Sequence, residues 1–394
     1  MQETYSEFID EVITIKNTVH KKNRTIYVPR ENIQMLYNKI VKKYPKFKEN
    51  VALEDFEHFI TDMIRNEKKI GSINNHIKTF FKEDVKHTFK FFFILGNISG
   101  FSNGYQLGNG KLFQLKHMGE KIKQTIDSYN ENDWFMLIEV NSKGVHNASI
   151  IAIREYRKNI CIHNICSGSI KYADNLTKFI SRQEYKVEKN GEPIIHIYSP
   201  AGFHLSTTPE IDIKVTKFNE IIKPNLSEIE RRIIKVLDIT SIIDEDTQLH
   251  VRFLLFTIAL ETLLLGKDDR DYLRKKFAEK ITYLIGIKYA LKVVNVEEVV
   301  SNNNIIDELK LILNLEKKIT TFYDNRSIIA HSGINDNINT KDVEDIATIL
   351  IIIIEKLFDL IETEKLTHIS KTSINDNASL DFYMSKLKYG TILS

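Results

Sequence analysis

Residues 343–362 read VEDIATILIIIIEKLFDLIE, and they contain the longest apolar run of the chain, IATILIIII at 346–354. Glu355 and Lys356 close this run well short of the roughly 18 apolar residues that a membrane-spanning helix requires. A run of this length, continued by further apolar residues, is typical of a helix inside a protein core. The stretch therefore predicts a long, almost wholly buried helix and no membrane span.

The proline distribution extends this prediction to the whole C-terminal part of the chain. None of the six prolines follows Pro224, and proline breaks the interior of helices. Helical spacing of apolar residues recurs in the segments 226–240, 250–266, 272–286 and 305–325. We therefore predict an all-helical domain over residues 225–394, which ends in a short helix or tail after residue 367.

Helix-boundary signals agree with this prediction. Ser227 is followed three residues later by Glu230, the spacing of a capping box at a helix start. Gly266, Gly286 and Gly333 stand where apolar helical patterns stop, which is the usual place of a C-terminal glycine.

The first 220 residues have a different pattern. Residues 1–85 are charged and have helical spacing, whereas strand signals dominate 89–200. The strand candidates are 89–101, 133–141, 147–156 and 193–200, with SKG at 142–144 as the turn of a hairpin. We predict an α+β domain over residues 1–220. No nucleophile, metal cluster or phosphate loop is recognisable there, so an enzyme in this half is the least favoured reading.

Several local patterns in this half favour structural roles. GNISGFSNGYQLGNGK at 96–111 lacks the spacing of a phosphate loop, so its glycines are read as turns between strands. CIHNIC at 161–166 offers three possible metal ligands on an expected strand, where a structural zinc site requires four, and packing is favoured. The basic clusters HKKNR (20–24) and KKYPKFK (42–48) are read as solvated helix faces rather than phosphate contacts.

Bulk composition narrows the class of protein. The chain has 394 residues, 42% of them hydrophobic, and a net charge of +2. A net charge this small gives no overall positive potential that would attract nucleic acids or membrane surfaces. Its two cysteines, Cys161 and Cys166, make no disulfide framework, and the first residues do not have the pattern of a signal peptide. A cytoplasmic location is expected.

One segment has the residues of a catalytic site. YDNRSIIAHSG at 323–333 places Arg326 and His331 near the end of an amphipathic helix. Five residues turn a helix by about 500°, so the two side chains point about 140° apart. They converge only through the reach of arginine, a distorted turn, or a second copy of the segment. Histidine can move protons, and arginine can stabilise charge on a phosphate, so such a pair can cleave RNA. Spacing alone favours a structural role.

Three blocks of the sequence together resemble a HEPN domain, specifically the ApeA-like branch of prokaryotic anti-phage defence. They are FTIALETLLLG (256–266), LRKKFAEKITYLIG (273–286) and ITTFYDNRSIIAHSG (319–333), and the match covers about residues 226–365. The resemblance implies a helical bundle that dimerises and a metal-independent endoribonuclease without a cofactor. Its arginine–four residues–histidine motif falls on Arg326 and His331, which would line one cleft across the dimer.

The resemblance also suggests supporting residues. Ser327 fills the polar position after the arginine, and we assign it positioning rather than proton transfer. Glu261, an acid inside an apolar helix, is either a mate for Arg326 or a surface acid. Tyr323 is favoured as a core or interface residue, and Asp324 either orients His331 or contacts solvent.

We therefore expect a cytoplasmic, homodimeric HEPN endoribonuclease with RNA as substrate. By analogy, residues 1–220 would be a sensor or regulatory domain that responds to a phage-derived trigger. The alternative is a non-catalytic HEPN dimer that binds RNA or a partner protein.

Overall fold

The computed structural model of the chain describes residues 4–17, 20–22, 25–65, 87–95, 97–120, 123, 130–168, 185–189, 192–195, 204–222, 225–243, 247–266, 269, 272–293, 305–370 and 377–388. The described residues form two compact units, one within 1–95, 112–156 and 184–199, the other within 96–111, 157–183 and 200–394. The first unit mixes helices with an antiparallel sheet, and the second is largely helical, so the chain has an α+β part followed by a helical part.

The N-terminal elements are mostly helical, as predicted. They are α1 (Thr4–Asn17), the hairpin of β1 (His20–Lys22) and β2 (Thr25–Tyr27), α2 (Arg30–Lys43), α3 (Pro45–Asn50) and α4 (Leu53–Arg65). In α2, the buried residues Ile33, Leu36 and Ile40 repeat at helical spacing and pack in one core with Phe56 and Ile60 of α4. The prediction of a helix face at 20–24 is wrong for residues 20–22, because β1 pairs with β2 there, and residues 23–24 lie outside the described residues. Residues 66–86 lie outside the described residues.

The first unit also contains an antiparallel sheet. The strands β7 (Trp134–Ser142), β3 (His87–Leu95), β8 (Tyr185–Lys189) and β9 (Glu192–Ile195) are neighbours in that order, and each pair is antiparallel. Phe91, Phe92 and Phe93 are all buried although neighbouring side chains of a strand point to opposite faces. Both faces of the sheet are therefore covered. The strand predicted at 133–141 is confirmed. The one predicted at 89–101 is confirmed as far as Leu95, where β3 ends, and residues 97–99 form a separate strand. The strand β9 confirms the start of the one predicted at 193–200, and residues 196–200 lie outside the described residues.

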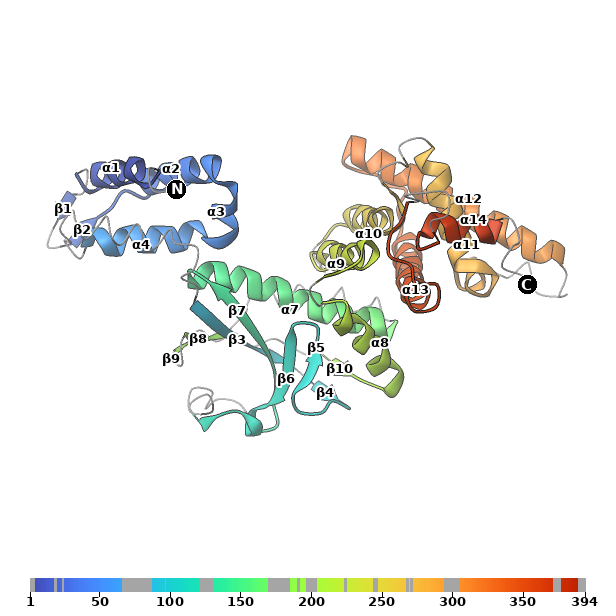
Figure 1. Cartoon of the computed structure of the whole chain (residues 1–394), viewed down its shortest axis with the longest axis horizontal. Helices are drawn as coiled ribbons and strands as arrows, with labels where there is room; N and C mark the ends of the chain where they lie inside the picture. Colours follow the sequence, from blue (N-terminus) through green and yellow to red (C-terminus); the bar gives the residue numbers. More distant parts are fainter. Residues whose placement is uncertain are drawn as a thin grey trace. The chain divides into compact units, whose positions relative to one another are not determined.

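The strand predicted at 147–156 is wrong, as is the hairpin turn before it. These residues belong to α7 (Val145–Ser167), a helix that also contains the CIHNIC segment expected on a strand. Its buried residues Ala148, Ala152, Tyr156 and Ile160 are four apart, which is helical spacing. The β-branched isoleucines between them obscured this period. Figure 1 shows α7 lying across the sheet, where Tyr156 stacks on Phe93 with ring centroids 4.4 Å apart.

A contact from a distant segment begins α7. The Asp55 carboxylate accepts hydrogen bonds from the backbone N–H groups of His146 (2.9 Å) and Asn147 (2.7 Å). These are N–H groups of the first turn, which have no partner inside the helix. Gly144 leaves room for the carboxylate, because a Cβ at that position would collide with Asp55. The cap comes from 91 and 92 residues away, so no local pattern indicates where this helix begins.

Short strands and turns surround the glycine-rich segment, as predicted. They are β4 (Asn97–Ser99), β5 (Tyr105–Leu107), β6 (Gly110–Gln114) and the 3-10 helix η1 (Leu115–His117), and β4 pairs in parallel with β10 (His204–Ser206). The helix α8 (Pro209–Glu220) follows, and the Tyr105 hydroxyl donates to its Asp212 (2.8 Å). The segment thus has the turn role that its spacing predicted.

The C-terminal part is a helical bundle (Figure 1). Its helices are α9 (Glu228–Thr240), α10 (Leu249–Leu264), α11 (Leu273–Val293), α12 (Ile305–Ser332), α13 (Thr340–Thr363) and the short α14 (Leu380–Lys388). The capping box of Ser227 and Glu230 is present, and α10 ends two residues before Gly266. At Gly286 the helical conformation is interrupted, as predicted, but a second helical piece continues to Val293.

The apolar run 346–354 lies within α13, and most of its residues are buried, which confirms the central prediction. Ile346, Ile353 and Leu357 have no exposed surface. One charged residue of α13, Asp345, is also buried, and its carboxylate is held by Lys318 of α12 and Lys341. Across the described residues, none of the helices has the length and apolar content needed to cross a bilayer.

Candidate active site

The predicted catalytic residues lie in the last two turns of α12. The helix ends at Ser332, and Gly333 adopts a φ of 80°, a left-handed conformation that favours glycine. The Gly333 N–H donates to the Ile329 carbonyl at 2.8 Å. Gly333 is therefore the C-terminal glycine that the sequence predicted. Because α12 is continuous through both residues, Arg326 and His331 point in the different directions expected from their five-residue step.

Arg326 points towards α10 and pairs with Glu261. Its Nη2 donates to Glu261 Oε2 at 2.9 Å, and the side chains are only 28% and 16% exposed. This decides between the two interpretations of Glu261 in favour of a mate for Arg326. The pair has a single hydrogen bond, because Arg326 Nε and Glu261 Oε1 are both buried without a partner among the described residues. One buried donor and one buried acceptor of the pair are thus without a hydrogen bond.

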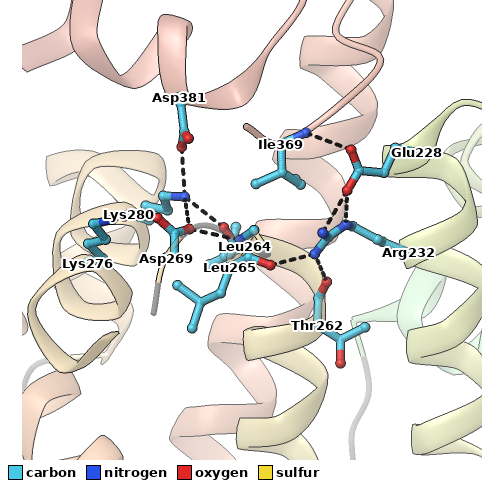
Figure 2. Close-up of polar contacts among 11 residues, drawn as sticks. Glu228, Arg232, Thr262, Leu264, Leu265, Asp269, Lys276, Lys280, Ile369 and Asp381 are labelled. Carbon is cyan, nitrogen blue, oxygen red and sulfur yellow. Dashed lines mark hydrogen bonds and ion pairs between the residues drawn. The ribbon is translucent and has the colours of Figure 1, made fainter. Parts of the chain in front are cut away.

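A polar cluster holds the end of α10 that carries Glu261 (Figure 2). Arg232 Nη1 donates to the carbonyls of Thr262 and Leu265, each at 2.7 Å, and Lys280 Nζ donates to the Leu264 carbonyl at 2.9 Å. The last carbonyls of a helix have no partner within the helix, so these cations satisfy them and favour its negative end. The cluster therefore fixes the turn from which Glu261 reaches Arg326.

Carboxylates in turn hold the two capping cations. Glu228 binds Arg232 (2.6 Å), while Asp269 and Asp381 bind Lys280 (3.0 and 2.7 Å). Burial raises the pKa of Asp269, but its hydrogen bond from Lys276, the Gly266 N–H and the charge of Lys280 outweigh burial and leave the pKa below its usual value. Asp269 therefore stays ionised and continues to hold Lys280 near neutral pH.

The Glu261 carboxyl has the opposite shift. Burial raises its pKa above the usual value, and the charge and hydrogen bond of Arg326 offset only part of the rise. Burial also raises the pKa of the Tyr323 phenol, with a further rise from the charge of Glu261. A neutral phenol and a carboxyl that accepts protons more readily than usual thus lie near the Arg326 guanidinium.

His331 is exposed in the last turn of α12. Among the described residues, no hydrogen bond or ion pair to its imidazole is found. Two exposed apolar side chains are close to it in sequence, Ile328 one turn earlier and Ile334 just after the helix end. An exposed imidazole can reach a bound substrate, but within one copy of the chain nothing described orients the ring.

The supporting residues have separate environments. Tyr323 is half-buried and packs on Phe277 of α11 with ring centroids 5.5 Å apart, as expected for a core residue. Asp324 forms a two-point ion pair with Arg274 of α11, at 2.7 and 2.6 Å, a partner that neither interpretation of Asp324 included. Ser327 is half-buried, one residue after the arginine. Arg274 thus lies next to the motif although the sequence did not single it out.

The CIHNIC segment has the packing role favoured from sequence. Cys161, His163 and Cys166 are buried in α7, where Cys161 contacts the Thr240 hydroxyl at 3.0 Å and His163 Nε2 contacts the Ser206 carbonyl at 2.8 Å. Burial raises the pKa of the Cys161 thiol to about 11. In the described part of the chain, no cluster of three or more histidine, cysteine or acidic side chains has the geometry of a metal site.

Replacing Arg326 by alanine should raise the pKa of Glu261 further, because both effects of Arg326 lower it. The pKa of the Glu261 carboxyl is higher in the folded state than its ordinary value of 4.5. The protein therefore becomes less stable as pH rises from 4.5 through the pKa of the folded state. In Arg326→Ala this pH range extends to higher pH. The free energy of unfolding of the variant should be lower than that of wild type by about 1–3 kcal/mol at neutral pH. Urea unfolding at a series of pH values measures this difference.

Two variants serve as controls for this titration. His331→Ala removes an exposed side chain that does not contact Glu261 and should leave the pH profile unchanged. Adding Glu261→Gln to Arg326→Ala removes the titrating group and should abolish the extra pH dependence. If the double variant keeps the same profile as Arg326→Ala, Glu261 is not the group responsible.

Comparison with known proteins does not extend the site. No protein-family model, no curated protein and no solved structure matches this chain. The interpretation of the site therefore depends on its own residues and contacts.

Proposed function

We propose that this protein is a metal-independent HEPN endoribonuclease that acts in anti-phage defence by cutting RNA. The observation that supports it best is the contrast within the motif in α12. Arg326 is half-buried and tied to Glu261, whereas His331 is exposed in the next turn and a half of the same helix. A positioned cation and an accessible proton carrier are the two groups that metal-free RNA cleavage requires.

The chemistry follows from the two side chains. His331 takes the proton of a ribose 2′-OH, and the 2′-oxygen attacks the neighbouring phosphorus. The bond from phosphorus to the 5′-oxygen of the next nucleotide breaks, and that oxygen receives a proton, from histidine or water. Arg326 stabilises the negative charge that develops on the phosphate oxygens. The products carry a 2′,3′-cyclic phosphate and a 5′-hydroxyl.

The site is proposed to form across a homodimer. One α12 directs Arg326 and His331 to different sides, so a single copy does not bring them to one phosphate. In a two-fold interface the same surface meets itself, and the arginine of one protomer then meets the histidine of its partner. In this proposal the N-terminal α+β part is the regulatory domain, a phage-derived molecule is its trigger, and the protein acts in the cytoplasm.

The test is cleavage of RNA by the purified full-length chain in the presence of a chelator. Wild type should give fragments with 2′,3′-cyclic phosphate ends. His331→Ala and Arg326→Ala should each lose at least about 10²-fold in rate. His117→Ala and Arg231→Ala remove exposed residues of the same types elsewhere and should keep full activity. No cleavage by wild type, or equal cleavage by His331→Ala, would contradict the proposal.

A second candidate function is a non-catalytic HEPN dimer that binds RNA or a partner protein. It is favoured by the environment of the same two residues, because Glu261 offsets the charge of Arg326 and nothing described orients the His331 ring. Expression in cells with and without phage challenge separates the two functions. Toxicity that disappears in Arg326→Ala and His331→Ala supports the nuclease, whereas binding that survives both substitutions without toxicity supports the scaffold.

A further inference from the structure

One face of α12 leads from His331 to Arg274. Asp324, Ile328 and His331 are four and three residues apart, so on a regular helix they lie within about 60° of one another. The distance along the helix axis from Asp324 to His331 is about 10 Å, at roughly 1.5 Å per residue. Ile328 is 48% exposed, and the His331 side chain is exposed as well. We call this strip of Asp324, Ile328 and His331, with Arg274 at its start, the α12 face.

Arg274 is held in a defined orientation at the start of this face. Its Nε and Nη2 donate to the two oxygens of Asp324, so one edge of the guanidinium is occupied. Arginine has five N–H donors, of which two are used here. The remaining donors are on Nη1 and the outer side of Nη2, and no other partner for them is found among the described residues. The side chain is 57% exposed, so this second edge is open to a ligand.

The open edge fits a phosphate. Two parallel N–H groups of a guanidinium match two oxygens of a phosphate. Because Asp324 already holds the Arg274 side chain in one conformation, less conformational entropy is lost when a phosphate binds. Between this edge and His331 lies Ile328, which offers an apolar contact to a base or ribose. A strand that binds Arg274 through one phosphate can therefore follow the α12 face and bring another phosphate to His331.

We propose that Arg274 is a phosphate-binding residue for single-stranded RNA, and that the α12 face is the path of the substrate to His331. Single-stranded RNA is the substrate class because its unpaired bases are free to contact the exposed Ile328, whereas the bases of a duplex are stacked and paired. This proposal rests on the proposed function, because it takes RNA as the ligand. The proposal goes beyond that function by assigning an RNA contact outside the arginine–histidine motif. Arg274 acts in binding and has no part in proton transfer.

The test measures binding separately from cleavage. In the full-length His331→Ala protein, affinity for a fluorescein-labelled single-stranded RNA is measured by anisotropy at several salt concentrations. Adding Arg274→Ala should weaken binding about tenfold, the usual effect of one charged hydrogen-bonded contact. The slope of log affinity against log salt should fall by about 0.7, the value for one phosphate contact on a single strand. Arg274→Lys keeps the charge without the fork and should recover the slope but not the full affinity.

Lys275→Ala is the matched control, because this exposed lysine is the next residue on α11 and has the same charge. Lys275→Ala should weaken RNA binding much less than Arg274→Ala does. An equal loss of affinity would mean that RNA responds only to the positive charge of this region and not to a specific contact with Arg274, which overturns the proposal. The mass of the protein in solution is measured for each variant. If Arg274→Ala changes the oligomeric state and not RNA affinity, the α12 face is a protein interface and the proposal is wrong.

The same variants distinguish failure of this proposal from failure of the nuclease. In active protein, Arg274→Ala should raise KM with kcat unchanged, because a uniform binding contact is lost. RNA binding that depends on Arg274 in a protein that never cleaves RNA contradicts only the nuclease. Cleavage with unchanged KM in Arg274→Ala contradicts only the role of Arg274. No RNA binding by any variant contradicts both.

Discussion

Replacement of Lys280 by methionine should lower the free energy of unfolding by about 3–5 kcal/mol, the usual cost of removing one partner from a buried ion pair. Lys280 is buried in α11 and contacts three groups, the carboxylates of Asp269 and Asp381 and the Leu264 carbonyl. Methionine has similar length and fills the space, so the loss reports the polar contacts rather than a cavity. Urea unfolding followed by circular dichroism measures the change.

The reason for the large effect is the position of the groups left behind. Asp269 is itself buried and would keep only Lys276 and the Gly266 N–H as partners. The Leu264 carbonyl would lose its donor at the end of α10, where the helix supplies none. We therefore expect the pKa of Asp269 to rise in the variant. A carboxyl with a lowered pKa contributes its full stabilisation above the ordinary value, 3.8 here, and loses it as pH falls through the pKa of the folded state. Because that folded-state pKa is higher in the variant, the contribution of Asp269 should be lost at higher pH during acid unfolding than in wild type.

Lys275→Met provides the control for Lys280→Met, since this lysine is in the same helix but 70% exposed and has only a 3.9 Å contact to Glu279. Substitution at such a site usually changes stability by less than about 0.5 kcal/mol. If the two variants are equally stable, the buried cluster does not hold the end of α10. The role assigned to it in fixing Glu261 would then be wrong.

Replacement of Phe322 by alanine should cost about 3–5 kcal/mol, the usual range for truncating a buried phenylalanine. Phe322 is almost completely buried in α12 and meets Phe253 of α10 edge to face, with ring centroids 5.4 Å apart. Truncation removes this contact and leaves a cavity between the two helices that carry Glu261 and Arg326. Thermal and urea unfolding of the two proteins measure the loss.

Leu313→Ala, on the same helix but with its side chain exposed, should change stability by less than about 0.5 kcal/mol. Phe322→Leu keeps part of the volume and should recover part of the stability. A cost for Phe322→Ala no larger than for Leu313→Ala would mean that α10 and α12 are not packed as described. The geometry of the Arg326–Glu261 pair would then lose its support.

Local sequence was sufficient for the C-terminal bundle because its signals are local. Helical periods, the capping box at Ser227 and the glycines at 266, 286 and 333 are each readable within a few residues. The same method failed at 147–156, where a run rich in isoleucine suggested a strand. The helical period there is apparent only over the whole of α7, and the cap that begins this helix comes from Asp55 in a distant segment.

Part of the candidate site was also readable from sequence. Arg326 and His331 were found by type and spacing, and helical geometry alone required their side chains to diverge. The partners of these residues were not readable, because they depend on which helices meet. Glu261 lies 65 residues from Arg326, and Arg274 lies 50 residues from Asp324. Both pairs form because α10 and α11 pack against α12 in the folded chain.

By itself, the sequence determined that residues 343–362 form a buried helix, that the last part of the chain is a helical bundle, and that Arg326 and His331 diverge on one helix. These properties follow from side-chain periodicity and backbone geometry, which act over a few residues. Only the tertiary structure decided that Glu261 holds Arg326, that Asp324 holds Arg274, and that a polar cluster fixes the end of α10. Those pairings depend on packing between distant helices, because an ion pair needs its two groups within a few ångströms.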